Sequence, residues 1–464
     1  MKKNRFPWGS FLKSVAAIAI PVALQNMLTT TGSMIDTMMI APLGENFVGA
    51  VGLCAQFTSL MFSCYWGFVG GGMLFYAQYW GAKDDDGIDR SYGITVICMM
   101  AVALTFAVAG VAFPEKVMSI YTDKVGLQHI GVDYLRIVGF AWPFQVFSMA
   151  VSALMRTTGK VRIPLYAAIV SVSSNIFLNW VFINGHLGAP AMGVRGAALA
   201  TVCAAFINAL FCVLAAAVCR YPYLFHIRRH FRWSKKHLGE YFRKCFPIIC
   251  NELLIGIGNA CISMILGRQS EEAIAAIAVF RTLEGLIIGF FAGFSNASSV
   301  LVGKSVGAGE IKPALDRAKR IVYLCSATIC AVCIVLYCTR GLYLPLMGLS
   351  GKSYIYGGQL ILIYAVGATI RMGNWTQNDT FRSAGDATYG TVLEIIFMYI
   401  MVLPLVWLSG IYFKAPLAVI FICCLIDEPI RYILMQIHLY SGKWIKPVTD
   451  VGKKALREFM EAEQ

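Results

Sequence analysis

The sequence predicts an all-α membrane protein: twelve transmembrane helices in two six-helix bundles, related by a pseudo-twofold axis along the membrane normal. Its composition, the spacing of its apolar runs and an internal repeat all indicate this fold. Of the 464 residues, 58% are hydrophobic and only 14% are charged, and the mean hydropathy is +0.67. Soluble chains carry about 25% charged residues, so this chain has too few charges to cover an aqueous surface. A cytosolic enzyme, a secreted disulfide scaffold and a disordered chain are therefore excluded.

Apolar runs of about 20 residues, the length that crosses a bilayer, occur about twelve times along the chain. The first run follows Lys2, Lys3 and Arg5, as in a signal peptide, but it is longer and more polar in its middle, and no small-residue cleavage site follows it. We therefore predict a retained first helix. The predicted spans cover residues 14–40, 47–78, 92–113, 133–155, 163–184, 193–219, 246–267, 275–303, 320–340, 355–381, 390–411 and 415–438.

The net charge of +14 indicates membrane topology rather than nucleic-acid binding, because the basic residues lie in short polar gaps between apolar runs. Roughly four Lys or Arg residues lie on the side that holds both termini for each one on the other side. Positively charged loops stay in the cytoplasm. We predict a multi-pass protein of the cell membrane with both termini cytoplasmic and no nucleic-acid partner.

The 15 cysteines predict neither a metal site nor a disulfide framework. Most of them lie singly inside apolar runs, where a thiol behaves as a small buried hydrophobe. Cys330 and Cys333 lie in an apolar run that offers no histidine or carboxylate to complete a metal site.

The longest polar segment divides the chain into halves. It runs from Arg220 to Lys244 and is rich in basic residues, as expected of a cytoplasmic connection. We predict an N-terminal six-helix lobe over residues 1–219, a basic linker over 220–245, a C-terminal six-helix lobe over 246–440 and a cytoplasmic tail over 441–464.

The two halves repeat at a constant offset of 226 residues. The matches need no gap: Pro21 with Pro247, residues 45–51 with 271–277, Gly81-Ala82 with Gly307-Ala308, and residues 156–159 with 382–385. Each half holds an even number of predicted spans, so both halves enter the membrane from the same side, as in the parallel repeats of some secondary transporters. Two bundles with a seam between them can rock to open toward either face. The paired prolines, which weaken a helix, mark candidate bends in the first helix of each half.

Polar side chains inside the first-half spans mark a candidate site, because ionisable groups in a bilayer are costly. Asp36 is the clearest; alternatively, it lies near the outer helix end and is satisfied by water or a cap. Asn175 and Asn179 share one helical face, and their alternative role is hydrogen bonding between helices. Thr201 joins this group or bonds to its own helix backbone.

The second half carries more charge. Glu252 has no partner within its own span, which favours a titrating or cation-binding carboxylate. Arg281 and Glu284 lie three residues apart, and Asp427 and Glu428 lie near Arg431 on another span, so both groups are candidates for local ion pairs. Arg371 stands in the tenth predicted span.

The sequence offers no other chemistry. It has no phosphate-binding loop, which excludes ATP as the direct energy source, and no nucleophile or zinc motif. We predict no cofactor, so uphill transport would draw on an ion gradient.

Several motifs resemble the multidrug and toxic compound extrusion (MATE) family over about residues 14–440. They are Met34-Ile35-Asp36-Thr37, Ala77-Gln78-Tyr79-Trp80-Gly81-Ala82, Met155-Arg156-Thr157-Thr158-Gly159-Lys160, Asn175-Ile176-Phe177-Leu178-Asn179-Trp180, residues 188–198 and Phe381-Arg382-Ser383-Ala384-Gly385-Asp386. The resemblance implies a V-shaped pair of lobes that expels organic cations against Na⁺ or H⁺.

The resemblance also implies roles for single residues. Asp36 occupies the place of an ion-coupling carboxylate, and Asn175 and Thr201 stand where family members place its polar partners. Asn179 stands where several members carry an Asp, which removes one titratable group. Glu252 resembles the second-lobe acid of the Na⁺-coupled branch.

Arg371 departs from that branch, which has an acid in the tenth span. This change argues against a complete Na⁺ site in the second lobe. We hypothesise that Arg371 is the counter-charge of Glu252, with Glu284 as a further second-lobe candidate.

The leading functional hypothesis is an antiporter that exports amphipathic or cationic organic compounds in exchange for H⁺ or Na⁺. Its partners would be small organic substrates and the lipid bilayer, and the chain would act as a monomer. A flippase for lipid-linked precursors is the alternative, and it would need a wide basic cavity, for which Arg136, Arg281, Arg371 and Arg431 are candidates. A membrane-embedded enzyme lacks any matching motif.

Overall fold

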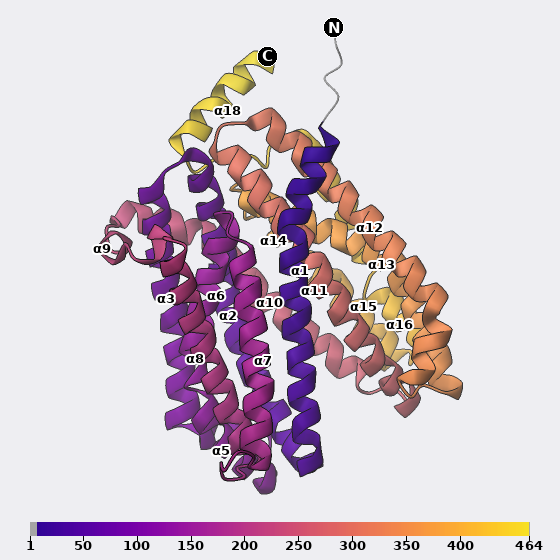
Figure 1. Cartoon of the computed structure of the whole chain (residues 1–464). Helices are drawn as coiled ribbons and strands as arrows, with labels where there is room; N and C mark the ends of the chain where they lie inside the picture. The colour runs from indigo at the N-terminus through magenta and orange to yellow at the C-terminus, as the bar shows by residue number, and fades with distance from the viewer. Residues whose placement is uncertain (1–6, 464) are drawn as a thin grey trace. The chain divides into compact units, whose positions relative to one another are not determined.

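The computed structural model describes residues 7–463, which form helices and no strand (Figure 1). In the first half the helices are α1 (Trp8–Ile40), η1 (Ala41–Leu43), α2 (Glu45–Ala82), α3 (Asp85–Ala112), α4 (Pro114–Tyr121), α5 (Val125–Val138), α6 (Ala141–Thr157), α7 (Arg162–Asn184) and α8 (Val194–Val218). The connection holds η2 (Pro222–Leu224) and α9 (Ile227–His230). In the second half they are α10 (Lys235–Leu266), α11 (Glu271–Gly307), α12 (Ile311–Leu346), α13 (Gly351–Ser383), α14 (Tyr389–Phe397), η3 (Met398–Val402), α15 (Leu403–Trp407), η4 (Leu408–Tyr412), α16 (Leu417–Cys423), α17 (Asp427–Ser441) and α18 (Asp450–Glu463).

Ten helical segments of the described chain are long and apolar enough to cross a membrane, or eleven if α5 and α6, bent by 51°, form one span. The sequence predicts twelve. The predicted twelfth span corresponds to α16 and α17, which have 7 and 15 residues. Each is too short to cross a bilayer alone. They are separated by a turn that comes just before Asp427 and Glu428, so the charges lie where the helix is interrupted.

Two compact units make up the chain. Of the described residues, one unit contains 7–23, 77–83 and 246–463, and the other contains 24–76 and 84–245. The basic segment 220–245 thus belongs to the same unit as α3 and α6–α8. The chain passes between units at 23/24, 76/77, 83/84 and 245/246; Pro21 lies near the first of these passages and Pro247 near the last. Both α1 and α10 continue through their proline.

In the unit of residues 24–76 and 84–245, α7 packs along α8, and α6 packs against α8 and α3. Small side chains allow these close contacts: the buried face of α8 includes Ala197, Ala200, Ala204 and Ala209. Ile40 at the end of α1 joins Ile183 and Val194 in a small apolar cluster. This packing places the end of α1 beside the end of α7.

In the other unit, α13 packs along both α11 and α12. Its apolar core includes Phe280, whose ring meets those of Tyr364 and Phe421 edge to face with centroids 5.1 and 4.9 Å apart. Offset and edge-to-face geometries are the preferred ones for aromatic pairs. The core thus joins α11, α13 and α16.

The ends of α2 and α11 cross in backbone contact. A Cβ atom on Gly81 would lie 2.0 Å from the carbonyl oxygen of Lys304, and one on Gly307 would lie 2.0 Å from that of Gln78. Gly81 and Gly307, like Gln78 and Lys304, are 226 residues apart. The two contacts are therefore equivalent under the internal repeat, and the repeated glycines are explained by this close approach.

Gln78 also joins the C-terminal segment to this crossing. Its buried amide donates to the carbonyl of Ser383 over 2.9 Å and accepts from the backbone N–H of Val448 over 2.7 Å. Thr449 donates to the carbonyl of Gly307 over 2.9 Å. Beyond it, α18 packs its apolar face against α11 and α12. A fully bonded buried amide fixes the positions of three segments at once.

We predict that Gly307→Ala destabilises the protein by about 1–3 kcal/mol, the usual cost of overpacking. The added methyl group would meet the backbone of Gln78, which cannot rotate away. Gly285→Ala in the same helix is the control, because no atom lies within 4 Å of its new Cβ. Thermal unfolding in detergent measures both variants, and equal midpoints would contradict the close crossing.

A second polar cluster follows α13, outside the candidate spans. The carboxylate of Asp386 is hydrogen-bonded to Nε2 of His438 over 3.0 Å and forms an ion pair with Lys446 over 3.0 Å. Burial acts to raise the pKa of Asp386, but its bonds with His438 and Lys446 outweigh burial and hold the pKa below its ordinary value. The ionised carboxylate therefore ties α13 to α17 and the C-terminal segment.

We predict that Asp386→Asn lowers the thermal midpoint at neutral pH and that this difference disappears in acid. A depressed folded-state pKa gives stability that is present above the ordinary pKa of aspartate and is lost as the pH falls through the lowered value. Unfolding scans from about pH 7 to about pH 3 would measure the convergence. A constant gap, or an equal gap for the exposed Asp450→Asn, would count against this role.

Candidate ion-coupling site

The first-half site forms where the ends of α1 and α7 meet. Asn179 donates from Nδ2 to a carboxylate oxygen of Asp36 over 2.6 Å and to the side-chain carbonyl of Asn175 over 3.3 Å. Asn175 and Asn179 are buried, and Asp36 is partly buried. The four-residue spacing places both amides on one face of α7. The structure therefore brings three of the predicted residues together.

Thr201 on α8 bonds mainly within its own helix, donating to the carbonyl of Ala197 over 3.0 Å. This is the alternative that the sequence left open. Tyr134 of α5 lies close enough to interact with both Asp36 and Thr201, and sequence reasoning missed it. A tyrosine in a predicted span is too common to be singled out without a neighbour.

Unlike Glu252, Glu284 and Glu428, which pair with arginines, Asp36 has no basic partner among the described residues. In the part of the chain that the structure describes, no Lys, Arg or His forms an ion pair with it, and its recorded hydrogen-bond donor is the neutral amide of Asn179. The side-chain oxygen of Asn179 is buried and has no donor among the described residues. The Asn179 oxygen and the Asp36 carboxylate thus lie close together, and no basic side chain of the described residues pairs with either.

The hypothesis that Arg371 is the counter-charge of Glu252 is wrong. Arg382 pairs with Glu252, with Nη1 3.2 Å from Oε1, and also lies 3.6 Å from Asp379. Both arginines are on α13, and Arg382 lies eleven positions after Arg371, about three helical turns along the helix. This distance along α13 brings Arg382, and not Arg371, next to Glu252 of α10. Glu252 is therefore not an isolated carboxylate.

Arg371 instead pairs with Glu284 over 2.9 Å and approaches Glu428 at 3.7 Å. Arg281 shares Glu284 over 3.0 Å, as the three-residue spacing predicts. The guanidinium of Arg371 thus links α11 to α17, a connection that no sequence pattern predicts.

Arg431 completes the network. It pairs with Glu428 over 2.7 Å and Asp427 over 3.2 Å, the local pairs that the sequence predicts, and lies 3.6 Å from Glu394 on α14. Neutral amides stabilise the same acids: Asn374 donates to Glu428 over 2.7 Å, and Asn251 donates to Glu394 over 3.0 Å. Buried charges require this kind of pairing and hydrogen bonding.

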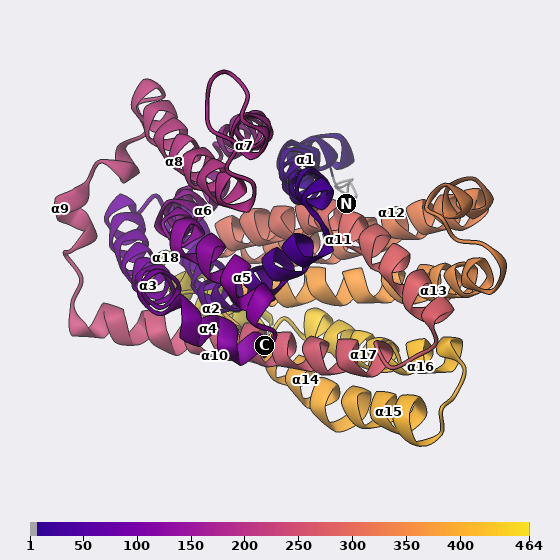
Figure 2. The ribbon, with the colours of Figure 1, turned by 90° about the horizontal axis from the view of Figure 1, so that it is seen from below.

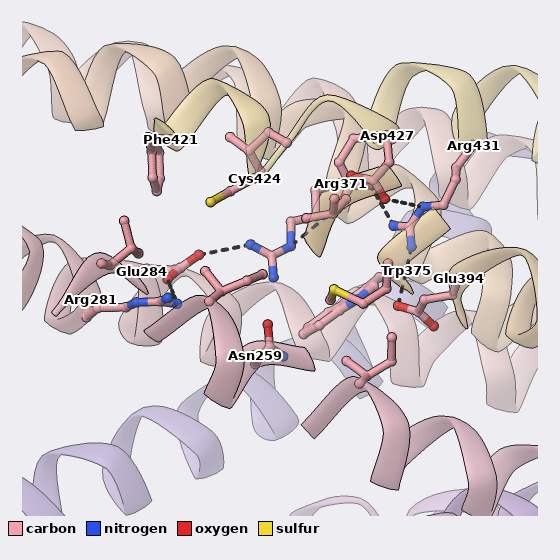
Figure 3. A pocket seen from close by; sticks show the side chains of 17 residues that line it. Asn259, Arg281, Glu284, Arg371, Trp375, Glu394, Phe421, Cys424, Asp427 and Arg431 are labelled. Carbon is pink, nitrogen blue, oxygen red and sulfur yellow. Dashed lines mark hydrogen bonds and ion pairs between the residues drawn. The ribbon is translucent and has the colours of Figure 1, made fainter. Parts of the chain in front are cut away.

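These charges line a cavity of about 80 Å³ within the second half. Figure 3 shows Glu284, Arg371 and Arg431 in a row, with Trp375 and Asn259 facing the same space. Apolar side chains, among them Ile262, Met398 and Phe421, line the same cavity. Met398 belongs to a π-helical turn, and Asp427 follows the break between α16 and α17. Interrupted helices and π-turns are frequent at functional sites in membrane proteins.

The cavity wall is not a basic surface. Its three arginines, Arg281, Arg371 and Arg431, face four carboxylates, Glu284, Glu394, Asp427 and Glu428. Each of these acids lies within 3.7 Å of an arginine nitrogen. The second half therefore supplies its own cations.

Sequence reasoning missed Arg382, Asp379 and Glu394 as members of this network. Arg382 was visible as the repeat partner of Arg156, but the repeat says nothing about pairing. Arg156 is buried and has no acidic partner among the described residues; it bonds to the carbonyl of Ser152 over 3.3 Å. Equivalent positions of the two halves thus carry different electrostatics.

Comparison with known proteins identifies the family. The MatE family model matches the chain twice, over residues 21–181 and 247–408. The chain belongs to the MatE family. Its two matches begin 226 residues apart, so the internal repeat found in the sequence is confirmed. The predicted membership of the MATE family is likewise confirmed.

The chain is similar over most of its length to transporters of this family. The probable multidrug resistance protein YoeA of Bacillus subtilis is 24% identical over 87% of this chain and 88% of its own length. The multidrug export protein MepA of Staphylococcus haemolyticus is 23% identical over 72% and 73%. A MATE crystal structure in complex with MaL6 superposes with a TM-score of 0.82 at 18% identity, covering 93% of this chain and 97% of that one.

These findings identify a multi-pass membrane transporter of the MatE family rather than an enzyme. The all-helical fold, with ten or eleven candidate spans in the described residues, agrees with that family.

We predict that Arg431→Met destabilises the protein by about 3–5 kcal/mol, because removing one partner leaves buried charges uncompensated. Three carboxylates contact this guanidinium. Arg281→Met is the matched control: Arg281 is 41% exposed, and its partner Glu284 keeps Arg371. Thermal or denaturant unfolding in detergent compares the two, and an equal loss in both would refute the network.

Proposed function

We propose that the protein is a secondary antiporter that exports amphipathic or cationic organic compounds in exchange for H⁺ or Na⁺. One observation carries this proposal: among the described residues Asp36 has no basic partner, whereas Glu252, Glu284 and Glu428 of the second half contact arginines. A membrane carboxylate that the chain does not neutralise is free to take a cation from solution. An acid already paired with a guanidinium gains little from one.

The site can hold either ion. A proton on Asp36 would remove its charge, and the unpaired side-chain oxygen of Asn179 would then accept from it or from a nearby donor. For Na⁺, the oxygen atoms of Asp36, Asn175, Asn179 and Thr201 are hard ligands of suitable chemistry. Since Asn179 is neutral, the site has one titratable carboxylate, so each cycle exchanges one coupling charge here.

Exchange follows because the coupling ion and the organic cation compete for the negative charge of Asp36. With Asp36 ionised, an organic cation is stabilised in the transport pathway; with Asp36 neutralised, the cation is released. The repeat and the two units support alternating access by movement of two halves, with twelve spans about a pseudo-twofold axis. Pro21 and Pro247, beside the passages between units, supply bendable helices.

Other parts of the proposal follow from the sequence. The basic loops support cytoplasmic termini. The substrates would be small organic molecules, and the chain would act as a monomer in the bilayer. It would need no cofactor beyond the coupling ion. Glu252, Glu284 and Arg371 would then maintain the second half rather than exchange ions.

The flippase alternative is less well supported. It requires a wide basic cavity for an anionic lipid-linked precursor. The arginines of the second-half cavity are matched by at least as many carboxylates, and Arg136 pairs with Glu115 on the exterior instead of lining it. No wall described so far carries the surplus of positive charge that such a substrate needs.

We predict that Asp36→Asn reduces gradient-driven efflux in proteoliposomes to the rate of empty liposomes, because an amide cannot exchange a cation. Efflux of a fluorescent organic cation is measured with ΔpH and with ΔNa⁺ imposed separately. The wild-type chain responds to one or both gradients. Asp123→Asn, an exposed acid with no recorded partner, is the control and keeps the wild-type rate.

Two outcomes would refute the proposal. Wild-type efflux that is equal with and without a gradient would exclude antiport. Gradient-driven efflux retained by Asp36→Asn would move the coupling site elsewhere.

A further inference from the structure

The segment between α8 and α10 presents an exposed apolar and basic surface, here called the linker strip. Its apolar members are Phe225, Ile227 and Phe231, whose exposed fractions are 47%, 64% and 62%. Its basic members are Arg228, Arg232, Lys235 and Lys236, which are all exposed. Between residues 225 and 236 the sequence contains no acidic residue. Three large apolar side chains in so short a segment are unusual for a surface that faces water.

The strip is held against the protein by a second set of side chains. His226 bonds through Nδ1 to the buried carboxylate of Asp89 over 2.8 Å, and Arg229 pairs with Asp86 over 3.3 Å. His230 is buried, bonds to the carbonyl of Tyr223 over 2.7 Å and meets the ring of Tyr92. These bonds attach α9 to the acidic start of α3. The side chains of the linker strip make no such bonds within the described chain and are exposed on the surface.

The position of the strip places it at a membrane surface. It joins α8, which ends at Val218, to α10, which begins at Lys235, and both helices are candidate spans. Figures 1 and 2 show α9 at the rim, beside the ends of α3 and α8 rather than among the helices. A chain that leaves one span and enters the next runs through the headgroup region, where aromatic and basic side chains are both stabilised.

The basic side chains of the strip are available for an external anion. Arg228, Arg232, Lys235 and Lys236 form no ion pair with any residue that the structure describes, whereas the neighbouring Arg229 is already engaged. A soluble anion would satisfy these charges but not the phenylalanines and Ile227. A phospholipid with an anionic headgroup satisfies both, since its phosphate meets the cations and its acyl chain meets the apolar side chains.

We propose that the linker strip binds anionic phospholipid in the leaflet on the side of the chain termini. Each Lys or Arg near such a surface strengthens binding on the order of fivefold, and the apolar side chains fix the strip at the depth of the headgroups. Anionic lipid then holds the connection between the two halves at the membrane surface. The inference does not depend on the transported substrate or on the coupling ion.

The test uses the full chain purified in detergent and titrated separately with phosphatidylglycerol and phosphatidylcholine, with bound lipid counted by native mass spectrometry. We expect the wild-type chain to bind phosphatidylglycerol at least about tenfold more tightly. A variant combining Arg228→Gln, Arg232→Gln, Lys235→Gln and Lys236→Gln should lose that preference. A variant combining Phe225→Ser, Ile227→Ser and Phe231→Ser should bind both lipids more weakly.

The matched control removes four exposed positive charges elsewhere: Lys443→Gln, Lys453→Gln, Lys454→Gln and Arg457→Gln. Two of these lie near acids of α18, so the preference for phosphatidylglycerol should persist. Thermal midpoints check that all variants fold; none of the substituted residues is buried.

Three results would overturn the proposal. The first is an unchanged preference in the linker-strip charge variant, and the second is an equal loss in the control variant. The third is displacement of phosphatidylglycerol by equimolar glycerol phosphate, which would indicate a site for a soluble phosphate ester.

Discussion

One electrostatic contrast underlies the rest of the structure: Asp36 lies in α1 beside neutral amides, whereas Glu252, Glu284 and Glu428 of the second half lie beside arginines. An ionised carboxylate in a medium of low polarity must gain a proton, a metal cation or a basic side chain. The second half solves this problem within the chain, through Arg371, Arg382 and Arg431. In the first half, no basic side chain of the described chain neutralises Asp36.

The contrast is informative because the two halves arose from one repeat. The matching glycines Gly81 and Gly307 still make equivalent contacts at the crossing of α2 and α11, so the scaffold has remained symmetric there. Electrostatics has diverged instead: Arg382 pairs with two acids, and its counterpart Arg156 pairs with none in the described chain. The two halves thus share equivalent backbone contacts and differ in how their charged side chains are paired.

The predictable part of the structure was that which depends on composition and local spacing. The helices, the repeat, the pairing of Asn179 with Asn175 and the ion pairs of Arg431 with Asp427 and Glu428 follow from hydrophobicity and helical periodicity. What failed was pairing between helices. Arg371 was assigned to Glu252, but three turns of α13 separate it from Arg382, and only the packing decides which arginine reaches α10. The break before Asp427 also escaped prediction, because an apolar run of sufficient length shows no sign of where its helix is interrupted.

Proton or sodium release on substrate binding tests the central contrast most directly. An organic cation is titrated into the purified chain in buffers of different ionisation enthalpy, and separately after loading with radioactive Na⁺. The account predicts that about one ion leaves per substrate bound, that the release vanishes in Asp36→Asn, and that it persists in Glu284→Gln, where arginines already hold the charge. Release that survives in Asp36→Asn but vanishes in Glu284→Gln would place ion exchange in the second half and contradict it.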